Sequence, residues 1–240
     1  MTDDMADDMA DGPTLAELVT ADPSTARVLE RHGLDYCCGG RRSLRAACEE
    51  RGIDAGSLLA ELGELGAGPA PDWASMGPAE LVEHLESTHH RYLHEELPLL
   101  SALAEKVVGV HGGRHPELAE VRGTYEELRA DLEPHLMKEE RVLFPMIREL
   151  VAAGETPELH CGSIANPIGV MLMEHDRAGE LLAHLRRSTD TYRPPEDACN
   201  SYRVLYSRLA QLEGDVHLHV HKENNLLFPA VLALADPTAR

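Results

Sequence analysis

Two stretches of this chain decide its fold: Asp131-Leu-Glu-Pro-His135-Leu-Met-Lys138-Glu139-Glu-Arg-Val-Leu143-Phe144-Pro145 and Asp215-Val-His-Leu-His219-Val-His-Lys222-Glu223-Asn-Asn-Leu-Leu227-Phe228-Pro229. Both follow the pattern Asp-x3-His-x2-Lys-Glu-x3-Leu-Phe-Pro. Residues four apart on a helix share one face, so each copy presents an imidazole and a carboxylate to the same neighbouring space. The pattern therefore predicts half of a metal site, twice.

The repeat extends upstream of these stretches. His90 lies 45 residues before His135, and His175 lies 44 residues before His219, each in a segment with helical periodicity. The chain thus contains two helical hairpins, whose four helices can meet at one internal point. A single His-x3-Glu is more often a surface pair, but two copies in one matching frame favour a shared metal site. The predicted donors are His90, His135, Glu139, His175, His219 and Glu223.

Helical geometry selects among the other histidines of the second stretch. At about 100 degrees per residue, His217 and His221 lie on roughly the opposite side of the helix from His219 and Glu223. Leu227, eight residues after His219, falls on the His219 face. We therefore expect His219 and Glu223 to point inward, and His217 and His221 to be exposed to solvent.

The first helix of the repeat offers several histidines. His84, His89 and His94 lie close to His90 in the sequence. The offset of 85 residues to His175 selects His90. His89 and His94 remain alternatives.

Nearby carboxylates could support the donors. Asp131 and Asp215 stand one turn before the histidines of the two stretches. A metal-bound imidazole usually donates its second N–H to a carboxylate or a carbonyl, so both aspartates could fill that role, or they could be solvated. Glu174 points about 100 degrees away from His175, and we expect it at the rim of the site.

The donor types narrow the choice of metal. Imidazole and carboxylate without thiolate suit iron or manganese better than structural zinc. Six side chains overfill one tetrahedral site, whereas two octahedral ions would keep positions free for bridges and small ligands. The donor set therefore predicts a pair of ions with redox chemistry available.

Composition excludes several classes of partner. The chain has 240 residues, of which 43% are hydrophobic and 27% are charged, and its formal net charge is −20. Such an acidic chain is repelled by nucleic acid and by anionic membrane surfaces. No stretch approaches the ~18 apolar residues of a membrane span, and the start lacks the pattern of an export signal. We therefore expect a cytoplasmic protein that binds neither nucleic acid nor membrane.

The periodicity and the breakers predict an all-α protein. Residues 1–12 read as a disordered acidic arm, residues 13–65 as a small helical domain, and the Gly- and Pro-rich residues 66–77 as a linker. Residues 78–236 then form a four-helix bundle. Its helices are expected over 78–110, 116–153, 167–189 and 195–235. About fifty residues make a thin core, so the small domain could also pair chains into a homodimer.

Five cysteines in a chain without an export signal favour reduced thiols. The adjacent Cys37 and Cys38 allow three functional interpretations: a vicinal disulfide, a metal site with further ligands, or a thiol that contacts a partner or client cluster. Structurally they could simply be small residues at a helix start. Two glycines follow, which would leave the thiols accessible. Cys48, Cys161 and Cys199 show no pattern that indicates a role.

Taken together, these motifs resemble a known family. The stretch from Ala79 to Leu234 resembles the hemerythrin-like cation-binding domain. The stretch Leu34-Asp-Tyr-Cys-Cys-Gly-Gly40 is similar to the short domain that precedes it in the Repair of Iron Centres family of di-iron proteins. Both resemblances occur in the order of that family and together cover most of residues 14–235.

The resemblance implies an oxo-bridged pair of non-haem iron ions held by the six predicted donors. It also implies repair of iron–sulfur clusters damaged by nitrosative or oxidative stress, through iron donation to damaged iron–sulfur proteins, with Cys37 and Cys38 as candidate catalytic residues. The alternative is a hemerythrin-like sensor of nitric oxide or dioxygen, or a nitric oxide reductase. Oxygen-carrying hemerythrins have a further histidine and an aspartate where this chain has Gly179 and Asn224, which argues against oxygen transport.

Overall fold

The computed structural model describes residues 12–65, 71–153 and 163–235. Within these ranges every regular element is a helix, and the one β-type contact is an isolated bridge between Thr14 and Ser43. The prediction of an all-α protein is confirmed. The expected acidic arm lies outside the described residues except for Gly12, as do residues 66–70 of the expected linker.

The described residues form two compact units. One contains the residues up to Gly77 together with His217–Ala230, and the other contains Pro78–Val216 together with the residues from Val231. The first unit therefore combines the N-terminal helices with part of the chain's last long helical run. The expected domain boundaries stay a prediction.

Short capped helices build the N-terminal part of the first unit. They are α1 (Leu15–Ala21), α2 (Thr25–Arg31), α3 (Leu44–Arg51), α4 (Ala55–Glu64) and the 3₁₀ helix η1 (Asp72–Ser75). Side-chain caps begin three of these helices. Thr14 and Glu17 form a capping box, and Ser43 and Asp54 accept backbone N–H groups at the starts of α3 and α4. Gly52 ends α3 with φ 65°, a left-handed conformation that glycine adopts without steric cost.

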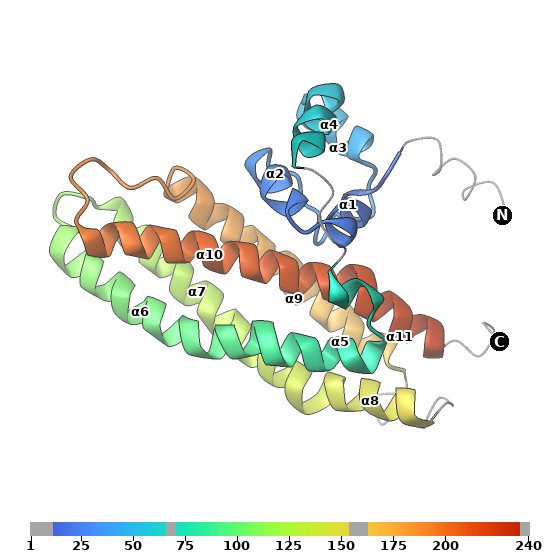
Figure 1. Ribbon diagram of the computed structural model, residues 1–240. Helices are drawn as coiled ribbons and strands as arrows, with labels where there is room; N and C mark the ends of the chain where they lie inside the picture. The colour runs from blue at the N-terminus through green and yellow to red at the C-terminus, as the bar shows by residue number, and fades with distance from the viewer. Residues whose placement is uncertain (1–11, 66–70, 154–162, 236–240) are drawn as a thin grey trace. The chain divides into compact units, whose positions relative to one another are not determined.

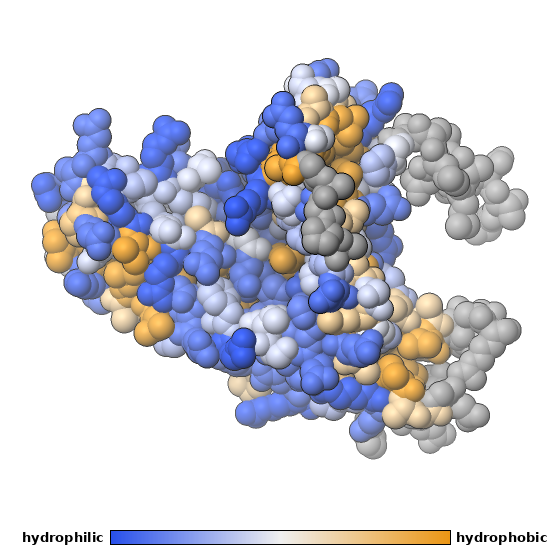
Figure 2. Space-filling model, viewed as in Figure 1, coloured by the Kyte–Doolittle hydropathy of each residue, from blue (hydrophilic) through white to orange (hydrophobic). Residues whose placement is uncertain are grey.

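Long helices build the second unit (Figure 1). They are α5 (Pro78–Leu85), α6 (Arg91–His111), α7 (Glu117–Lys138), α8 (Phe144–Ala153), α9 (Ala165–Ser188) and α10 (Asn200–Lys222), whose run continues into α11 (Phe228–Ala235). These bounds match the four expected helices to within a few residues at each end. Leucines fill the core, and Figure 2 shows hydrophilic residues over much of the long helices' surface. None of the helices in the described ranges is long and apolar enough to span a bilayer.

Three π-helical turns interrupt the long helices where the predicted donors lie. They are η2 (Glu86–His90), η3 (Glu139–Leu143) and η4 (Glu223–Leu227). Prolines explain two of them, because Pro145 and Pro229 follow η3 and η4 closely, and a proline ring clashes with the carbonyl four residues earlier. The wider turn relieves that clash. π turns inside α-helices are frequent at functional sites.

Candidate metal centre

Three helices of the second unit bring His90, His135, His175 and Glu139 together. All four side chains are almost completely buried. The Nε2 atoms of His135 and His175 lie 3.3 Å apart. The two carboxylate oxygens of Glu139 are divided between two imidazoles, with Oε1 3.4 Å from Nε2 of His135 and Oε2 3.4 Å from Nε2 of His90.

The second copy of the motif repeats this local geometry. Nε2 of His219 lies 3.3 Å from Oε1 of Glu223, and both side chains are buried. In both copies the glutamate is the first residue of a π turn, and the histidine stands four residues before it in the last α-helical turn. The repeated sequence therefore produces a repeated structure.

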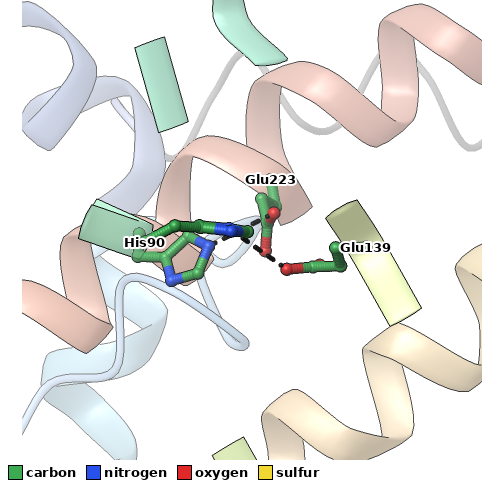
Figure 3. A group of neighbouring side chains, drawn as sticks. His90, Glu139 and Glu223 are labelled. Carbon is green, nitrogen blue, oxygen red and sulfur yellow. Dashed lines mark ion pairs between the residues drawn. The ribbon is translucent and has the colours of Figure 1, made fainter. Parts of the chain in front are cut away.

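The donor atoms gather into two groups that share their carboxylates. His90, Glu139, His219 and Glu223 form one group, in which one donor atom from each residue lies within 4.8 Å of the others. His135, Glu139, His175 and Glu223 form the other group by the same measure. Figure 3 shows His90, Glu139 and Glu223 pointing toward one another. All six predicted donors belong to these groups, and the alternatives His89 and His94 belong to neither.

The spacing of these atoms fits metal coordination. Two donors bound at about 2.1 Å to one ion, at right angles, lie about 3 Å apart. Separations of 3.3–3.4 Å between imidazole nitrogens and carboxylate oxygens come close to that value. The donors are imidazoles and carboxylates, a set that suits iron or manganese. A buried cluster of this chemistry fits a metal site.

Two further carboxylates contact the outer nitrogens of the histidines. Nδ1 of His90 lies 3.0 Å from Oε1 of Glu140, and Nδ1 of His135 lies 2.9 Å from Oε2 of Glu174. Such contacts orient a metal-bound ring and make its other nitrogen a better donor. Sequence reasoning missed Glu140 and placed Glu174 at the rim. The signal was present, because each glutamate is adjacent in the sequence to a predicted donor.

The electrostatics of these glutamates agree with that role. Burial raises the pKa of Glu140, but its hydrogen bonds with His94 and His90 lower it more, so the net shift is downward. Burial likewise raises the pKa of Glu174, and contacts with Lys138 and His135 more than offset it. Both side chains therefore remain anionic next to the imidazoles that they orient.

Asp131 and Asp215, one turn before His135 and His219, contact residues other than these histidines. Asp131 is exposed and lies 3.7 Å from Nε of Arg177. Asp215 contacts Nδ1 of His89 at 2.9 Å. No contact supports the interpretation that these aspartates hold the imidazoles of His135 and His219. Their side chains contact Arg177 and His89 instead.

The expectation that His217 and His221 face solvent is wrong. His221 is fully buried, with Nε2 3.1 Å from Oγ1 of Thr20 and Nδ1 3.4 Å from the carbonyl of Tyr36. Burial lowers the pKa of His221 to about 4. His217 is partly buried, with Nδ1 3.3 Å from Oε1 of Glu30. The face of the helix opposite the donors is thus covered within the first unit.

The paired cysteines occupy a loop tied to that same helical segment. Asn224, which follows Glu223, donates through Nδ2 to the carbonyl of Cys37 at 3.3 Å and lies 3.9 Å from the sulfur of Cys38. Asn225 donates to the same carbonyl at 3.1 Å. The thiol loop is therefore attached directly beside a predicted metal ligand.

The two thiols differ in environment. Cys37 is buried, whereas Cys38 is half-buried. The hydrogen bond with Cys38, followed by burial and the nearby Asp35, raises the pKa of Cys37 well above its usual range. Both cysteines are free, with their sulfur atoms 3.9 Å apart. Cys38 is thus the more accessible thiol of the pair.

The carboxylate of Asp35 fixes the backbone of this loop through hydrogen bonds. Its Oδ1 accepts the backbone N–H groups of Cys37 and Cys38 at 3.0 and 2.9 Å, and Oδ2 accepts that of Gly39 at 3.0 Å. Although Asp35 and the two cysteines could offer three metal ligands, the carboxylate is already used to shape the loop. The second glycine is also structural, because a Cβ at Gly40 would overlap the carbonyl oxygen of Tyr36.

Family models match both parts of the chain. The hemerythrin HHE cation binding domain matches residues 81–231, which is more than half of the chain. A domain of unknown function, DUF542, matches residues 11–66. The cation-binding description agrees with the buried histidine and glutamate groups.

Relatives that match most of the chain are named as iron–sulfur cluster repair proteins. The probable iron-sulfur cluster repair protein of Haemophilus influenzae is 36% identical over 225 residues, covering 91% of this chain and 96% of that protein. Iron-sulfur cluster repair proteins YtfE of Edwardsiella ictaluri and of Escherichia coli O81 are 37% and 34% identical, each over 220 residues, with the same two coverages.

Proposed function

Because this chain belongs to the family of iron–sulfur cluster repair proteins with a hemerythrin HHE cation-binding domain, we propose that it carries two non-haem iron ions and donates iron to damaged iron–sulfur proteins. The names of the relatives support the role in iron–sulfur cluster repair. The two groups of histidine and glutamate donors support the binding of iron.

One observation carries the di-iron proposal: Glu139 and Glu223 belong to both donor groups. Each group adds two histidines of its own, His90 with His219 and His135 with His175. In this proposal Glu139 and Glu223 would help to hold both ions, and each pair of histidines would help to hold one ion. Bound iron would supply redox chemistry and positions for an oxo bridge, dioxygen or nitric oxide.

The small number of negative charges among the six donors favours weak binding of iron, which donation requires. Two glutamates contribute two negative charges, whereas two ferrous ions carry four positive charges. Four imidazoles add nitrogen donors without charge. Such a site holds metal more weakly than a carboxylate-rich one, since fewer anions offset the cations. Glu140 and Glu174 would keep the rings of His90 and His135 oriented whether or not iron is bound.

A transfer assay tests iron donation. Iron-loaded protein is incubated with an iron–sulfur enzyme whose cluster nitric oxide has damaged, in the presence of a chelator that traps free ferrous iron. We expect enzyme activity to recover with this protein and not with an equal amount of ferrous salt. The Glu139→Leu/Glu223→Leu variant, incubated beforehand with the same amount of iron, serves as the matched control. Equal recovery with free iron and chelator would rule out donation by the protein.

The position of the thiol loop favours a second candidate function, binding or reduction of nitric oxide. Asn224 holds the Cys37–Cys38 backbone beside Glu223, so a small ligand at the metal could be coupled to Cys38. We infer that Cys38 is the reacting thiol. With excess reductant, a reductase would form several molecules of nitrous oxide per chain, and Cys38→Ser would slow turnover more than Cys37→Ser. Fewer than one molecule per chain would leave ligand binding as the only role for nitric oxide.

We also infer a cytoplasmic location, supported by the four described cysteines, which are all free. Fractionation of cells with an antibody to this protein would test it. Recovery in a compartment that forms disulfides would contradict this location.

A further inference from the structure

A second reactive group lies far from the metal centre, where the end of α6 meets the start of α10. His111 is the last residue of α6, and Cys199 immediately precedes α10. Nε2 of His111 lies 3.0 Å from the sulfur of Cys199. Twenty-one residues of helix separate His111 from His90, which is about 30 Å along the axis. Neither residue can therefore serve the metal site directly.

The histidine of this pair is held rigidly. His111 is only 4% exposed, and its ring packs against Tyr202 with centroids 5.4 Å apart. Tyr202 is in turn buried against Tyr206. Packing of this kind fixes the ring plane and aims Nε2 at the sulfur.

The surroundings also decide which nitrogen carries the proton. Nδ1 of His111 is buried and makes no hydrogen bond within the described parts of the chain. Orphaned buried N–H groups are rarer in proteins than buried acceptors with a spare lone pair, which favours the tautomer without a proton on Nδ1. The proton therefore belongs on Nε2, which donates it to the sulfur. In this tautomer Nε2–H is the donor and the Cys199 sulfur is the acceptor.

Cys199 combines this donor with access. It is exposed to solvent, and its carbonyl accepts the N–H of Arg203 at 3.1 Å, which places it at the N-terminus of α10. The N-terminus of a long helix stabilises negative charge. The nearest carboxylate in the sequence, Asp197, already contacts Nε2 of His115 at 3.0 Å and Nη1 of Arg114 at 3.4 Å. Its charge is therefore partly neutralised.

We propose that Cys199, assisted by His111, is a modification site that forms mixed disulfides with low-molecular-weight disulfides. The Cys199 thiol first loses its proton to solvent. The thiolate then attacks one sulfur of the disulfide R–S–S–R, so that a bond forms between the Cys199 sulfur and that sulfur while the S–S bond of R–S–S–R breaks. The departing R–S⁻ takes a proton from solvent, so Cys199–SH and R–S–S–R become Cys199–S–S–R and R–SH. His111 positions the thiolate and is unchanged.

The test compares the same thiol in the folded and unfolded chain. Full-length protein is treated at neutral pH with oxidised glutathione, and separately with iodoacetamide, and mass spectrometry follows the peptide that contains Cys199. We expect Cys199 to react at least ~10-fold faster in the folded protein than in urea. Cys48, which is fully buried, serves as the internal control and should react more slowly when folded.

Variants separate the role of His111 from packing. His111→Phe keeps a ring beside Tyr202 but removes the donor, so the folded rate should fall to that of the unfolded chain. His111→Gln restores an N–H and should recover part of the rate. Equal rates for Cys199 in the folded and unfolded wild type would overturn the proposal, as would an unchanged rate in His111→Phe. Should His111→Phe fail to fold, the folded-to-unfolded ratio of the wild type decides alone.

Discussion

The two copies of the motif share one face and differ in the other. On the donor face, His135 and Glu139 match His219 and Glu223 in burial and in separation. On the opposite face the first copy is open to solvent, and the corresponding positions of the second copy are covered. Met137 is 45% exposed, whereas its counterpart, His221, is 0% exposed.

The lysines of the motif show the same divergence. Lys138 is exposed and pairs with Glu174. Lys222 is only 3% exposed, and its ammonium lies 5.0 Å from the centre of the Trp73 ring. A cation over an aromatic face is stabilised by the ring's electrons. One lysine thus serves a carboxylate that orients His135, and the other anchors η1.

The residue after each donor glutamate also differs between the copies. In the first copy it is Glu140, which contacts His90. In the second copy it is Asn224, which holds the cysteine loop. The donor face is thus the same in both copies, while the other face of the second copy contacts the N-terminal residues.

The largest effect should come from removing what the copies share. Glu139→Leu/Glu223→Leu should reduce bound iron from about two ions per chain to well below one, because both ions lose a bridge. Iron is measured by atomic emission on purified, folded protein. Glu133→Leu, an exposed glutamate on α7, is the control and should retain full iron. Two irons per chain in the double variant would disprove the bridging role.

The next effect should distinguish the outer faces. His221→Ala removes a fully buried ring and its contact with Thr20, so the free energy of unfolding should fall by about 2–4 kcal/mol. Met137→Ala changes the exposed counterpart and should cost less than about 0.5 kcal/mol. Urea unfolding of both variants at matched iron content provides the comparison. Similar losses in the two variants would contradict the asymmetry.

A smaller effect concerns the carboxylates that orient the rings. Glu140→Gln should weaken iron binding by about 10- to 100-fold, because the imidazole of His90 loses its anionic partner. Competition with a ferrous chelator measures this affinity. Glu180→Gln, an exposed glutamate on α9, should leave it unchanged. Unchanged affinity in Glu140→Gln would mean that the contact with His90 does not support the metal.

The smallest effect should appear in the cysteine loop. Asn225→Ala removes hydrogen bonds to the carbonyls of Tyr36 and Cys37, which should cost about 1 kcal/mol. Hydrogen exchange of the loop amides should then accelerate by about fivefold. Arg141→Ala alters the exposed counterpart and should leave these amides unchanged. Unaltered exchange in Asn225→Ala would show that the loop is held by other contacts.

The spacing of residues along the chain predicts some features of the fold and of the candidate site, and leaves others open. Spacing along one helix determines which side chains share a face, so the pairs His135–Glu139 and His219–Glu223 followed from four-residue intervals. Capping residues such as Ser43 and Asp54 act within a few residues, and the helices that they predict are present. Local rules therefore predicted the helices and the donor frame.

Spacing did not reveal which neighbour covers each remaining face. Helical spacing predicts that His221 is a surface residue, but the N-terminal residues Thr20 and Tyr36 contact its ring. Glu140 contacts the imidazole of His90, 50 positions away in the sequence. Glu174 contacts the imidazole of His135, 39 positions away.

The sequence by itself determined the helices, their caps and the inward donor face, since these depend on interactions within a few residues. Only the tertiary structure decided which carboxylates orient the imidazoles, which copy of the motif holds the thiol loop, and that His111 meets Cys199. These pairings join distant segments. Helical periodicity specifies the direction of a side chain relative to its own axis and contains no information about what lies opposite.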